Sequence, residues 1–266
     1  MYVISDVHGM YHTLLRLITS IEDLDPAPTF IFVGDFPDRG PFSRQVVDFV
    51  IKLLEQGHFA VRGNHDDVLD WICNGVCEGD MREMIYGDVC PASVLRWWLQ
   101  NGLGSALHSY GIDVMRLRYT ELPAEWDAVL DDIRSSIPES HRNFYRELPM
   151  SWENHSHFVV HAYVDPSIQF TRFGVKSVLG KQDKKMEALW SRFNGNFLAK
   201  GGETNWGKIG VFGHTPVFHY DSEEPIRKGN IRLIDTGAVF GKKMTAYCLE
   251  TDSFYSVDRD KDDVLG

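Results

Sequence analysis

The chain begins with Tyr2-Val3-Ile4-Ser5-Asp6-Val7-His8-Gly9, in which a short apolar run leads directly into an aspartate and a histidine. Such a run predicts a short buried strand. In α/β proteins, ligand sites lie beyond the carboxyl ends of the strands. The opening of the chain therefore predicts an α/β fold in which Asp6 and His8 lie at such an edge.

The same arrangement recurs four more times along the chain. The segments are Gly34-Asp35-Phe36-Pro37-Asp38-Arg39-Gly40, Arg62-Gly63-Asn64-His65-Asp66, Val160-His161-Ala162 and Gly213-His214-Thr215-Pro216. Each segment alone is weak, because a lone strand-end aspartate is usually a turn or cap residue and a lone histidine is usually structural. Five of them in one chain indicate a shared site.

Helical and strand patterns alternate in the first quarter of the chain. Apolar residues repeat at helical spacing from Met10 to Ile21 and from Phe42 to Leu54. Strands are expected at residues 2–5, 29–33, 58–62, 157–160, 209–212, 231–234, 244–250 and 254–257. We expect the strands after residue 156 to form a second sheet, and the charged end at 258–263 to fray.

The middle of the chain, residues 67–155, has mostly helical propensity. We interpret the 266 residues as one domain with this segment inserted as a helical cap. Because the cap starts directly after His65-Asp66, we expect it to lie near the site and to select the substrate. Its Trp97 and Trp98 are more typical of a cap core than of a substrate platform.

Composition narrows the range of partners. The net charge is −11 and the pI is about 5.4, which argues against binding of a nucleic-acid polymer, since that needs a basic face. The four cysteines (73, 77, 90 and 248) form no disulfide pattern and are expected to be reduced. No apolar run approaches the roughly 20 residues of a membrane span. We expect a cytoplasmic protein that does not contact membranes.

In their order and spacing, the five segments resemble the motifs of the calcineurin-like metallophosphoesterases: DxH, GDxxDRG, GNH before an acidic residue, an isolated His, and GH. The chain looks most like the phosphoprotein phosphatase branch, which includes bacterial and phage serine/threonine phosphatases and diadenosine tetraphosphatases. The matching parts are residues 2–66 and 157–250. The resemblance implies a two-sheet β-sandwich flanked by helices.

Two divalent metal ions are the cofactors that the resemblance implies. Such a pair, about 3.5–4 Å apart, lowers the pKa of a water and clamps the phosphate. Mixed oxygen and imidazole ligands suit manganese, which we expect first, or iron or zinc. Asp35 would bridge the two ions. The six implied ligands are Asp6, His8, Asp35, Asn64, His161 and His214.

The remaining site residues would bind the phosphate and move a proton. By resemblance, His65 is the general acid, and Asp38 orients its imidazole. Arg39 would hold phosphate oxygens through its planar fork, and Arg192, in Leu189-Trp190-Ser191-Arg192, resembles a second phosphate-binding arginine. Arg62 is also a candidate for this role, although its place before the Gly63 turn lets it point either way.

Two residues depart from the family pattern. Pro37 stands where a β-branched or apolar residue is usual, so the turn from Asp35 to Asp38 is expected to be stiffer. Tyr163 stands where glycine is usual, and its phenol could narrow the site or reach the substrate.

Three functions are compatible with these features. The first is a phosphomonoesterase of the serine/threonine phosphatase type, acting on phosphorylated protein, peptide or a small phosphoester. The second is a symmetrical hydrolase of dinucleoside polyphosphates such as diadenosine tetraphosphate, against which the intact Asp38-Arg39 pair argues. The third is a non-catalytic interaction scaffold, which typically loses metal ligands or the general acid.

Overall fold

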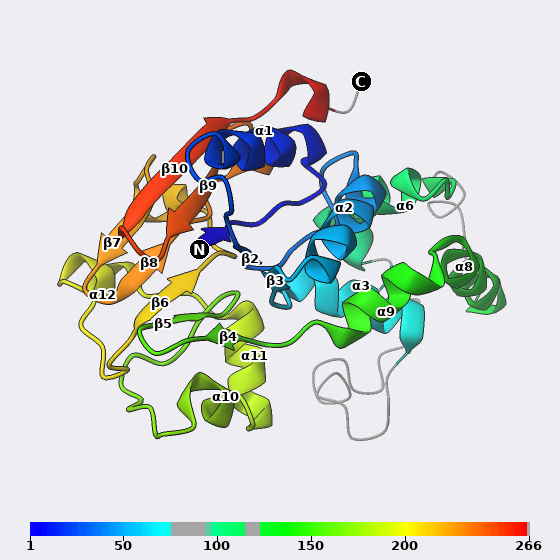
Figure 1. The fold of residues 1–266 in the computed structure, drawn as a ribbon. Coiled ribbons are helices and arrows are strands. Elements are labelled where there is room, and N and C mark those ends of the chain that lie inside the picture. Colours follow the sequence, from blue (N-terminus) through cyan, green and yellow to red (C-terminus); the bar gives the residue numbers. More distant parts are fainter. Residues whose placement is uncertain (76–94, 96, 115–122, 265–266) are drawn as a thin grey trace.

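The protein, described by a computed structural model over residues 1–75, 95, 97–114 and 123–264, contains two five-stranded sheets with helices around them (Figure 1). The first sheet has the order β10-β9-β1-β2-β3 and the second β4-β5-β6-β8-β7. The strands of the first sheet are β1 (Tyr2–Ile4), β2 (Phe30–Phe32), β3 (Phe59–Ala60), β9 (Lys243–Cys248) and β10 (Ser253–Asp258). Those of the second are β4 (Trp152–Glu153), β5 (His157–Val159), β6 (Ile209–Phe212), β7 (Ile226–Lys228) and β8 (Ile231–Leu233).

The two-sheet α/β architecture is as expected, but the membership of the sheets is not. The prediction that the later strands form the second sheet is wrong for β9 and β10. Strand β9 pairs antiparallel with β1, with Val3 opposite Tyr247, and β10 pairs with β9. Two edge strands of the second sheet, β4 and β7, were not predicted, because charged residues leave no apolar run there.

Alternating side chains of the first sheet face two different cores. Val3 and Ile31 pack between the two sheets, against Val159 and Val211 of the second sheet. Their neighbours along the strands, including Ile4, point to the opposite face and pack against helices. Because successive side chains of a strand point to opposite faces, an all-apolar strand indicates that both faces are covered.

Helices cover the outer face of each sheet. Over the first sheet lie α1 (Tyr11–Glu22) and α2 (Ser43–Glu55), close to the predicted ranges, and α3 (Asn64–Asn74), whose range was not predicted. Helices α10 (Gly174–Val178), α11 (Gln182–Trp190) and α12 (Gly195–Ala199) precede β6, and residues of all three join the hydrophobic core beside the second sheet or pack next to it. These three short helices were not predicted. Three one-turn 3-10 helices lie at Val217–Tyr220, Ala238–Phe240 and Lys261–Asp263.

The described part of the predicted cap is mostly helical. It contains the end of α3, then η1 (Leu99–Leu103), α6 (Gly104–Ser109), α8 (Pro123–Ser136) and α9 (Glu139–Glu147). Its buried residues, Trp98 and Tyr145 among them, belong to the same hydrophobic core as Ile4 and Leu14. Of the four cysteines, Cys73 and Cys248 are buried free thiols, and positions 77 and 90 lie outside the described residues.

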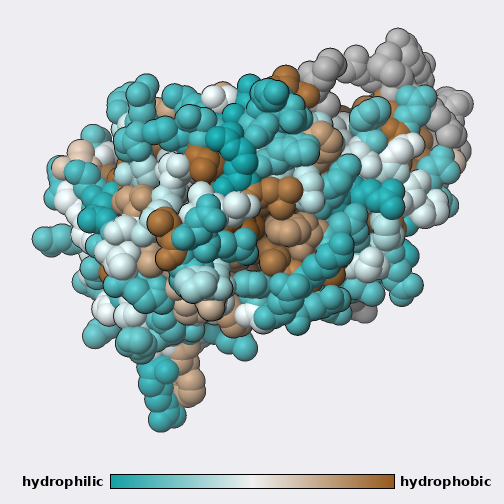
Figure 2. Space-filling view, turned by 45° about the horizontal axis from the view of Figure 1, so that its top comes forward, coloured by the Kyte–Doolittle hydropathy of each residue, from teal (hydrophilic) through white to brown (hydrophobic). Residues whose placement is uncertain are grey.

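The surface is mainly polar. Figure 2 shows a face on which hydrophilic side chains predominate and hydrophobic ones form small groups near the middle. Across the described ranges, we find no helix with the length and apolar character that crossing a membrane requires.

The expectation that the charged end frays is wrong, because Asp263 is buried against α1. Its carboxylate accepts hydrogen bonds from the backbone N–H groups of His12 and Thr13, at 3.0 and 2.7 Å, and from Thr13 Oγ1 at 2.6 Å. It thereby caps donors that a helix leaves unpaired in its first turn. The C-terminal segment thus fixes the helix that follows the first site residues.

Asp263→Ala is therefore expected to destabilise the protein by about 1–3 kcal/mol, because three donors, two of them buried, lose their acceptor. Urea unfolding followed by circular dichroism measures this change. Asp262→Ala, an exposed neighbour, is the matched control. Equal stability of both variants would contradict the capping role of Asp263.

Candidate active site

The candidate site lies at the carboxyl ends of six strands, three parallel strands in each of the two sheets. Strands β1, β2 and β3 are parallel in the first sheet, and β5, β6 and β8 are parallel in the second. The residue or loop after each of them carries a polar side chain of the site. The six predicted ligands follow five of these strands: Asp6 and His8 (β1), Asp35 (β2), Asn64 (β3), His161 (β5) and His214 (β6).

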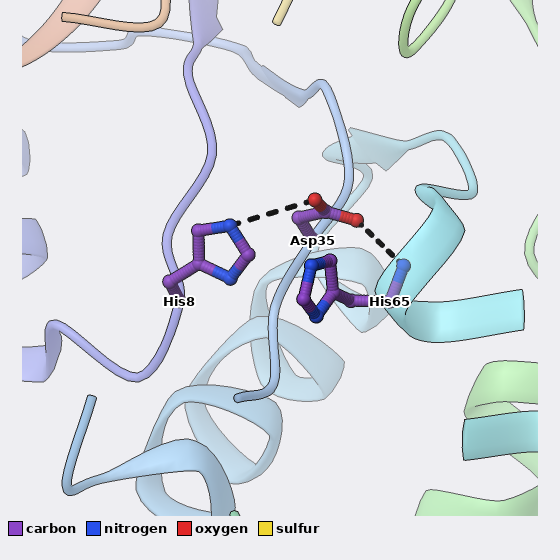
Figure 3. A group of neighbouring side chains, drawn as sticks. All are labelled: His8, Asp35 and His65. Carbon is purple, nitrogen blue, oxygen red and sulfur yellow. Dashed lines mark hydrogen bonds and ion pairs between the residues drawn. The ribbon is translucent and has the colours of Figure 1, made fainter. Parts of the chain in front are cut away.

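Asp35 belongs to two groups of side chains that could each hold a metal ion. One group is His8, Asp35 and His65, and the other is Asp35, His161 and His214; within each, the ligand atoms lie within 4.8 Å of one another. Figure 3 shows His8 and His65 on separate segments around Asp35. His8 Nε2 is 3.5 Å from Asp35 Oδ2, and the His65 backbone N–H donates to Asp35 Oδ1 at 2.9 Å. The Asp35 carboxylate thus belongs to both groups.

Backbone carbonyls orient two of the imidazoles. His8 Nδ1 donates to the Pro37 carbonyl at 3.0 Å, and His161 Nδ1 donates to the Val33 carbonyl at 2.9 Å. Both bonds leave Nε2 directed at Asp35, which is the usual arrangement around metal-binding histidines. Pro37, which departs from the family pattern, therefore positions His8 through its backbone carbonyl oxygen.

Asn64 and Asp6 complete the second group. Asn64 Oδ1 lies 2.9 Å from both His161 Nε2 and His214 Nδ1. The His214 backbone N–H donates to both carboxylate oxygens of Asp6, at 2.9 and 3.1 Å. His214 Nε2 is buried and has no hydrogen-bond partner in the part of the chain that the structure describes. Such an orphaned nitrogen next to carboxylate and amide oxygens suits a metal ligand.

Buried acidic groups give this site a need for positive charge. Burial, and then the nearby Asp235 carboxylate, raise the pKa of Asp6 well above its usual value. Burial also raises the pKa of Asp235 to about 6. Although burial opposes the ionisation of Asp35, the histidines around it, His161 first, hold its pKa well below the usual range. A cation bound here would stabilise the ionised carboxylates.

The site already contains one cation of the protein itself. Arg39 Nη1 donates to His8 Nε2 at 2.7 Å, and its Nη2 donates to His65 Nε2 at 3.0 Å. A positively charged group thus lies against two imidazoles of the first ligand group. Together with the shared Asp35 carboxylate, the orphaned nitrogen of His214 and the mixed oxygen and nitrogen donors, this arrangement fits a pair of divalent metal ions.

His65 is held by a buried carboxylate and a tryptophan. Its Nδ1 donates to Asp38 Oδ2 at 2.6 Å, and Trp98 Nε1 donates to the same oxygen at 2.7 Å. The Trp98 ring also packs on the His65 ring, with centroids 4.7 Å apart. Asp38 therefore orients the imidazole, and Trp98 fixes Asp38. Trp98 is buried as expected, although its role at the site was not predicted. Trp97, also expected in the cap core, is 46% exposed, so that expectation is wrong.

The backbone is strained where it carries these side chains. Seven non-glycine residues in the described ranges have positive φ. Five of them are site residues: His8, Asp35, Asp38, Arg39 and His214. Such conformations cost free energy, and they cluster at functional sites, where the surrounding structure enforces them.

Glycines permit two close approaches at the site. A Cβ on Gly213 would overlap Asp6 Oδ2, so only glycine lets β6 end against that carboxylate. Gly102 of the cap, at φ +106°, lies against Arg39, and its carbonyl accepts the Arg39 backbone N–H at 2.9 Å. Trp98 and Gly102 of the predicted cap therefore lie against Asp38 and Arg39 of the candidate site.

Arg62 does not have the predicted phosphate-binding geometry. It is buried, and its Nη1 donates to Asp67 at 2.8 Å and to Asp70 at 3.1 Å. Its remaining donors reach the backbone carbonyls of Tyr145, Arg146 and Leu148. The guanidinium thus connects α3 to the end of α9. The contacts of Arg62 therefore indicate a structural role in place of the predicted phosphate-binding role.

Arg62→Ala is expected to destabilise the protein by about 3–5 kcal/mol, because two buried carboxylates lose their cation and three carbonyls lose their donor. Thermal and urea unfolding measure the loss. Arg172→Ala, at an exposed arginine, is the control. A stable Arg62→Ala variant with a raised KM would instead restore the phosphate-binding assignment.

Arg192 lies near the second ligand group, whereas Tyr163 packs against the hydrophobic core beside the second sheet. Arg192 is exposed and makes no ion pair with any described residue. The pKa of His214 is lowered to about 3, first by burial and then by His161, and the charge of Arg192 contributes to this shift. Tyr163 packs against Phe193, with ring centroids 4.9 Å apart. The guanidinium of Arg192 is therefore free to bind an anion near His214.

Two acidic residues of the site were missed by the sequence analysis. Asp235 follows the apolar run that ends at Ile234, which is the same signal that identified the other site residues. Asp66 accepts hydrogen bonds from the backbone N–H groups of Asp35, Phe36 and Gly63, at 2.8 to 3.1 Å, and so joins two site loops. Nothing in the local sequence distinguishes that role from an ordinary helix cap.

Comparison with known proteins agrees with this geometry. The model of the calcineurin-like phosphoesterase family matches residues 1–218. The chain is 26% identical to an asymmetrical bis(5'-nucleosyl)-tetraphosphatase PrpE of Anoxybacillus flavithermus, over 92% of this chain and 88% of that protein. It is 27% identical to a symmetrical bis(5'-nucleosyl)-tetraphosphatase of Coxiella burnetii, over 96% and 90%.

A solved structure described provisionally as a diadenosine tetraphosphatase has the same fold, with a TM-score of 0.57 and 18% identity over 98% of this chain and 93% of that one. The family model covers most of the chain and all the predicted ligands. The chain therefore belongs to the calcineurin-like phosphoesterase family, and it is a metal-dependent phosphoester hydrolase.

Proposed function

We propose that two divalent metal ions, manganese first, are held by the six predicted ligands, with Asp35 common to both. The observation that carries this proposal is the position of the Asp35 carboxylate in both ligand groups. When bound, such a pair supplies an activated nucleophile and neutralises the phosphoryl oxygens. The six proposed ligands are Asp6, His8, Asp35, Asn64, His161 and His214.

The chain's own residues then bind the phosphate and move the proton. Arg39 and Arg192 hold phosphoryl oxygens, and Arg39 would leave its contacts with His8 Nε2 and His65 Nε2 when metal and substrate bind. His65 donates the proton from Nε2 to the leaving oxygen. Asp38, which accepts from Nδ1, stabilises the charged imidazole before this transfer.

For the substrate, we propose dinucleoside polyphosphates. Support comes from relatives named as bis(5'-nucleosyl)-tetraphosphatases, which align with more than nine-tenths of this chain. These likenesses include the cap, so they bear on the part of the chain expected to select the substrate. They support this substrate class over the phosphoprotein that the motifs alone favoured.

Phosphomonoesters of the phosphoserine or phosphothreonine type are the second candidate. The observation in their favour is the buried Asp38 beside His65, because an alkoxide leaving group needs a proton donor, whereas a nucleotide leaves readily without one. The scaffold alternative does not fit a chain in which the complete ligand set comes together.

Chelation is expected to abolish hydrolysis, and Mn²⁺ to restore it, because the site has buried carboxylates that need a cation. The assay uses diadenosine tetraphosphate, phosphoserine and phosphotyrosine peptides and nitrophenyl phosphate, and chromatography of the nucleotides released reports where the chain is cut. Full activity of exhaustively metal-free protein would refute the two-metal site. A higher kcat/KM for phosphopeptide than for the dinucleotide would favour the second candidate.

A further inference from the structure

Two tryptophans form a partly exposed aromatic surface beside the candidate site. Trp97, in the cap, is 46% exposed, which is unusual for so large an apolar side chain. Its ring is stacked with that of Trp190 at the end of α11, at an interplanar angle of 29° and with centroids 6.3 Å apart. The two residues come from separate parts of the chain. The fold therefore brings them together at the junction of cap and sandwich.

This surface is continuous with the proton-transfer residues. The Trp98 ring lies 5.0 Å from Trp97, 5.8 Å from Trp190 and 4.7 Å from His65, measured between centroids. The two outer tryptophans are thus one ring away from the imidazole that faces the leaving oxygen. His65 is the residue assigned to protonate the leaving oxygen, so this aromatic surface borders the leaving-group side of the site.

The metal ions and arginines proposed above hold phosphate groups, but they do not recognise what the phosphate groups carry. The chain carries a net charge of −11, which repels anionic substrates at long range. Stacking on an aromatic ring is independent of that charge and accepts any planar base, since every base has a π face. An exposed indole beside the leaving-group side of the site offers such a contact.

We propose that Trp97, backed by Trp190, binds the planar ring of the leaving group, which is a nucleobase when the substrate is a dinucleoside polyphosphate. The inference rests on the proposed function, because it assigns the leaving-group side of the same site. It makes Trp97 a specificity-determining residue that distinguishes ring-bearing phosphoesters from aliphatic ones.

The test compares ring-bearing with ring-free substrates in matched variants of the manganese-loaded protein. For Trp97→Leu, the ratio of kcat/KM for diadenosine tetraphosphate to that for phosphoserine is expected to fall about tenfold, mainly through KM. Trp97→Phe, which keeps a ring, is expected to recover most of the ratio. Phe59→Leu, at another exposed aromatic that packs on Trp152, is the control and leaves the ratio unchanged.

Further readouts separate this inference from the proposed function. Calorimetric titration with adenosine monophosphate is expected to show binding by the wild type that Trp97→Leu weakens and Trp97→Phe retains. If the wild type does not cleave diadenosine tetraphosphate, the proposed substrate is wrong. The ratio of kcat/KM for nitrophenyl phosphate to that for phosphoserine then tests whether Trp97 binds the ring of the leaving group. A ratio unchanged within about twofold in a Trp97→Leu variant with a normal melting temperature overturns the inference.

Discussion

Asp35→Asn is expected to remove metal from both ligand groups and to lower turnover roughly 1000-fold or more, since several kcal/mol of charge stabilisation are lost. Asp35 is the one residue that both groups share. A neutral amide bridges two cations poorly, so the change should not be confined to one metal. Metal content after gel filtration, measured by mass spectrometry, and steady-state kinetics with Mn²⁺ report the two effects.

The control for this variant is Asp131→Asn, which removes the same charge from an exposed position on α8. It should keep both its metal content and its activity. Circular dichroism of Asp35→Asn should remain native, because asparagine has nearly the same size and keeps an oxygen that can accept the His65 backbone N–H. Retention of one metal per chain with substantial activity would show that Asp35 does not bridge.

His65→Asn is expected to reduce turnover of phosphoserine by about 10²–10⁴-fold, the usual contribution of a general acid. The loss should be much smaller for nitrophenyl phosphate, because nitrophenolate leaves without a proton. Metal content should be retained, since the proposed task of His65 is proton transfer. Rates for both substrates at several pH values, together with metal analysis, measure these effects.

Because His65 also belongs to one potential metal group, the metal measurement decides between the two roles. Loss of one metal in His65→Asn would make it a ligand. Equal losses for the alkyl and nitrophenyl substrates would remove the general-acid assignment. Trp98→Phe offers a related comparison, because it takes away the second donor to Asp38 while leaving an aromatic ring against His65.

Much of the candidate site could be predicted because its residues share one local signal. Each ligand follows an apolar run, and a polar residue at a strand end is recognisable without knowledge of its partners. The same signal was available for Asp235 but was not used. Trp98 and Asp66 act through contacts with residues distant in the sequence, so their roles could not be predicted locally. For Arg62, the sequence left the direction of the side chain open, and packing against the cap decides it.

The sequence by itself determined the order of the first strands and helices, the residue types that gather at the strand ends, and the apolar faces that form the cores. These features depend on periodicity and on the chemistry of single side chains. It did not determine that β9 returns to pair with β1 and β10 with β9, that Asp263 caps α1, or that Trp97 meets Trp190. Pairing and stacking between distant segments depend on which surfaces remain uncovered once the sheets have packed together, and only the tertiary structure decides that.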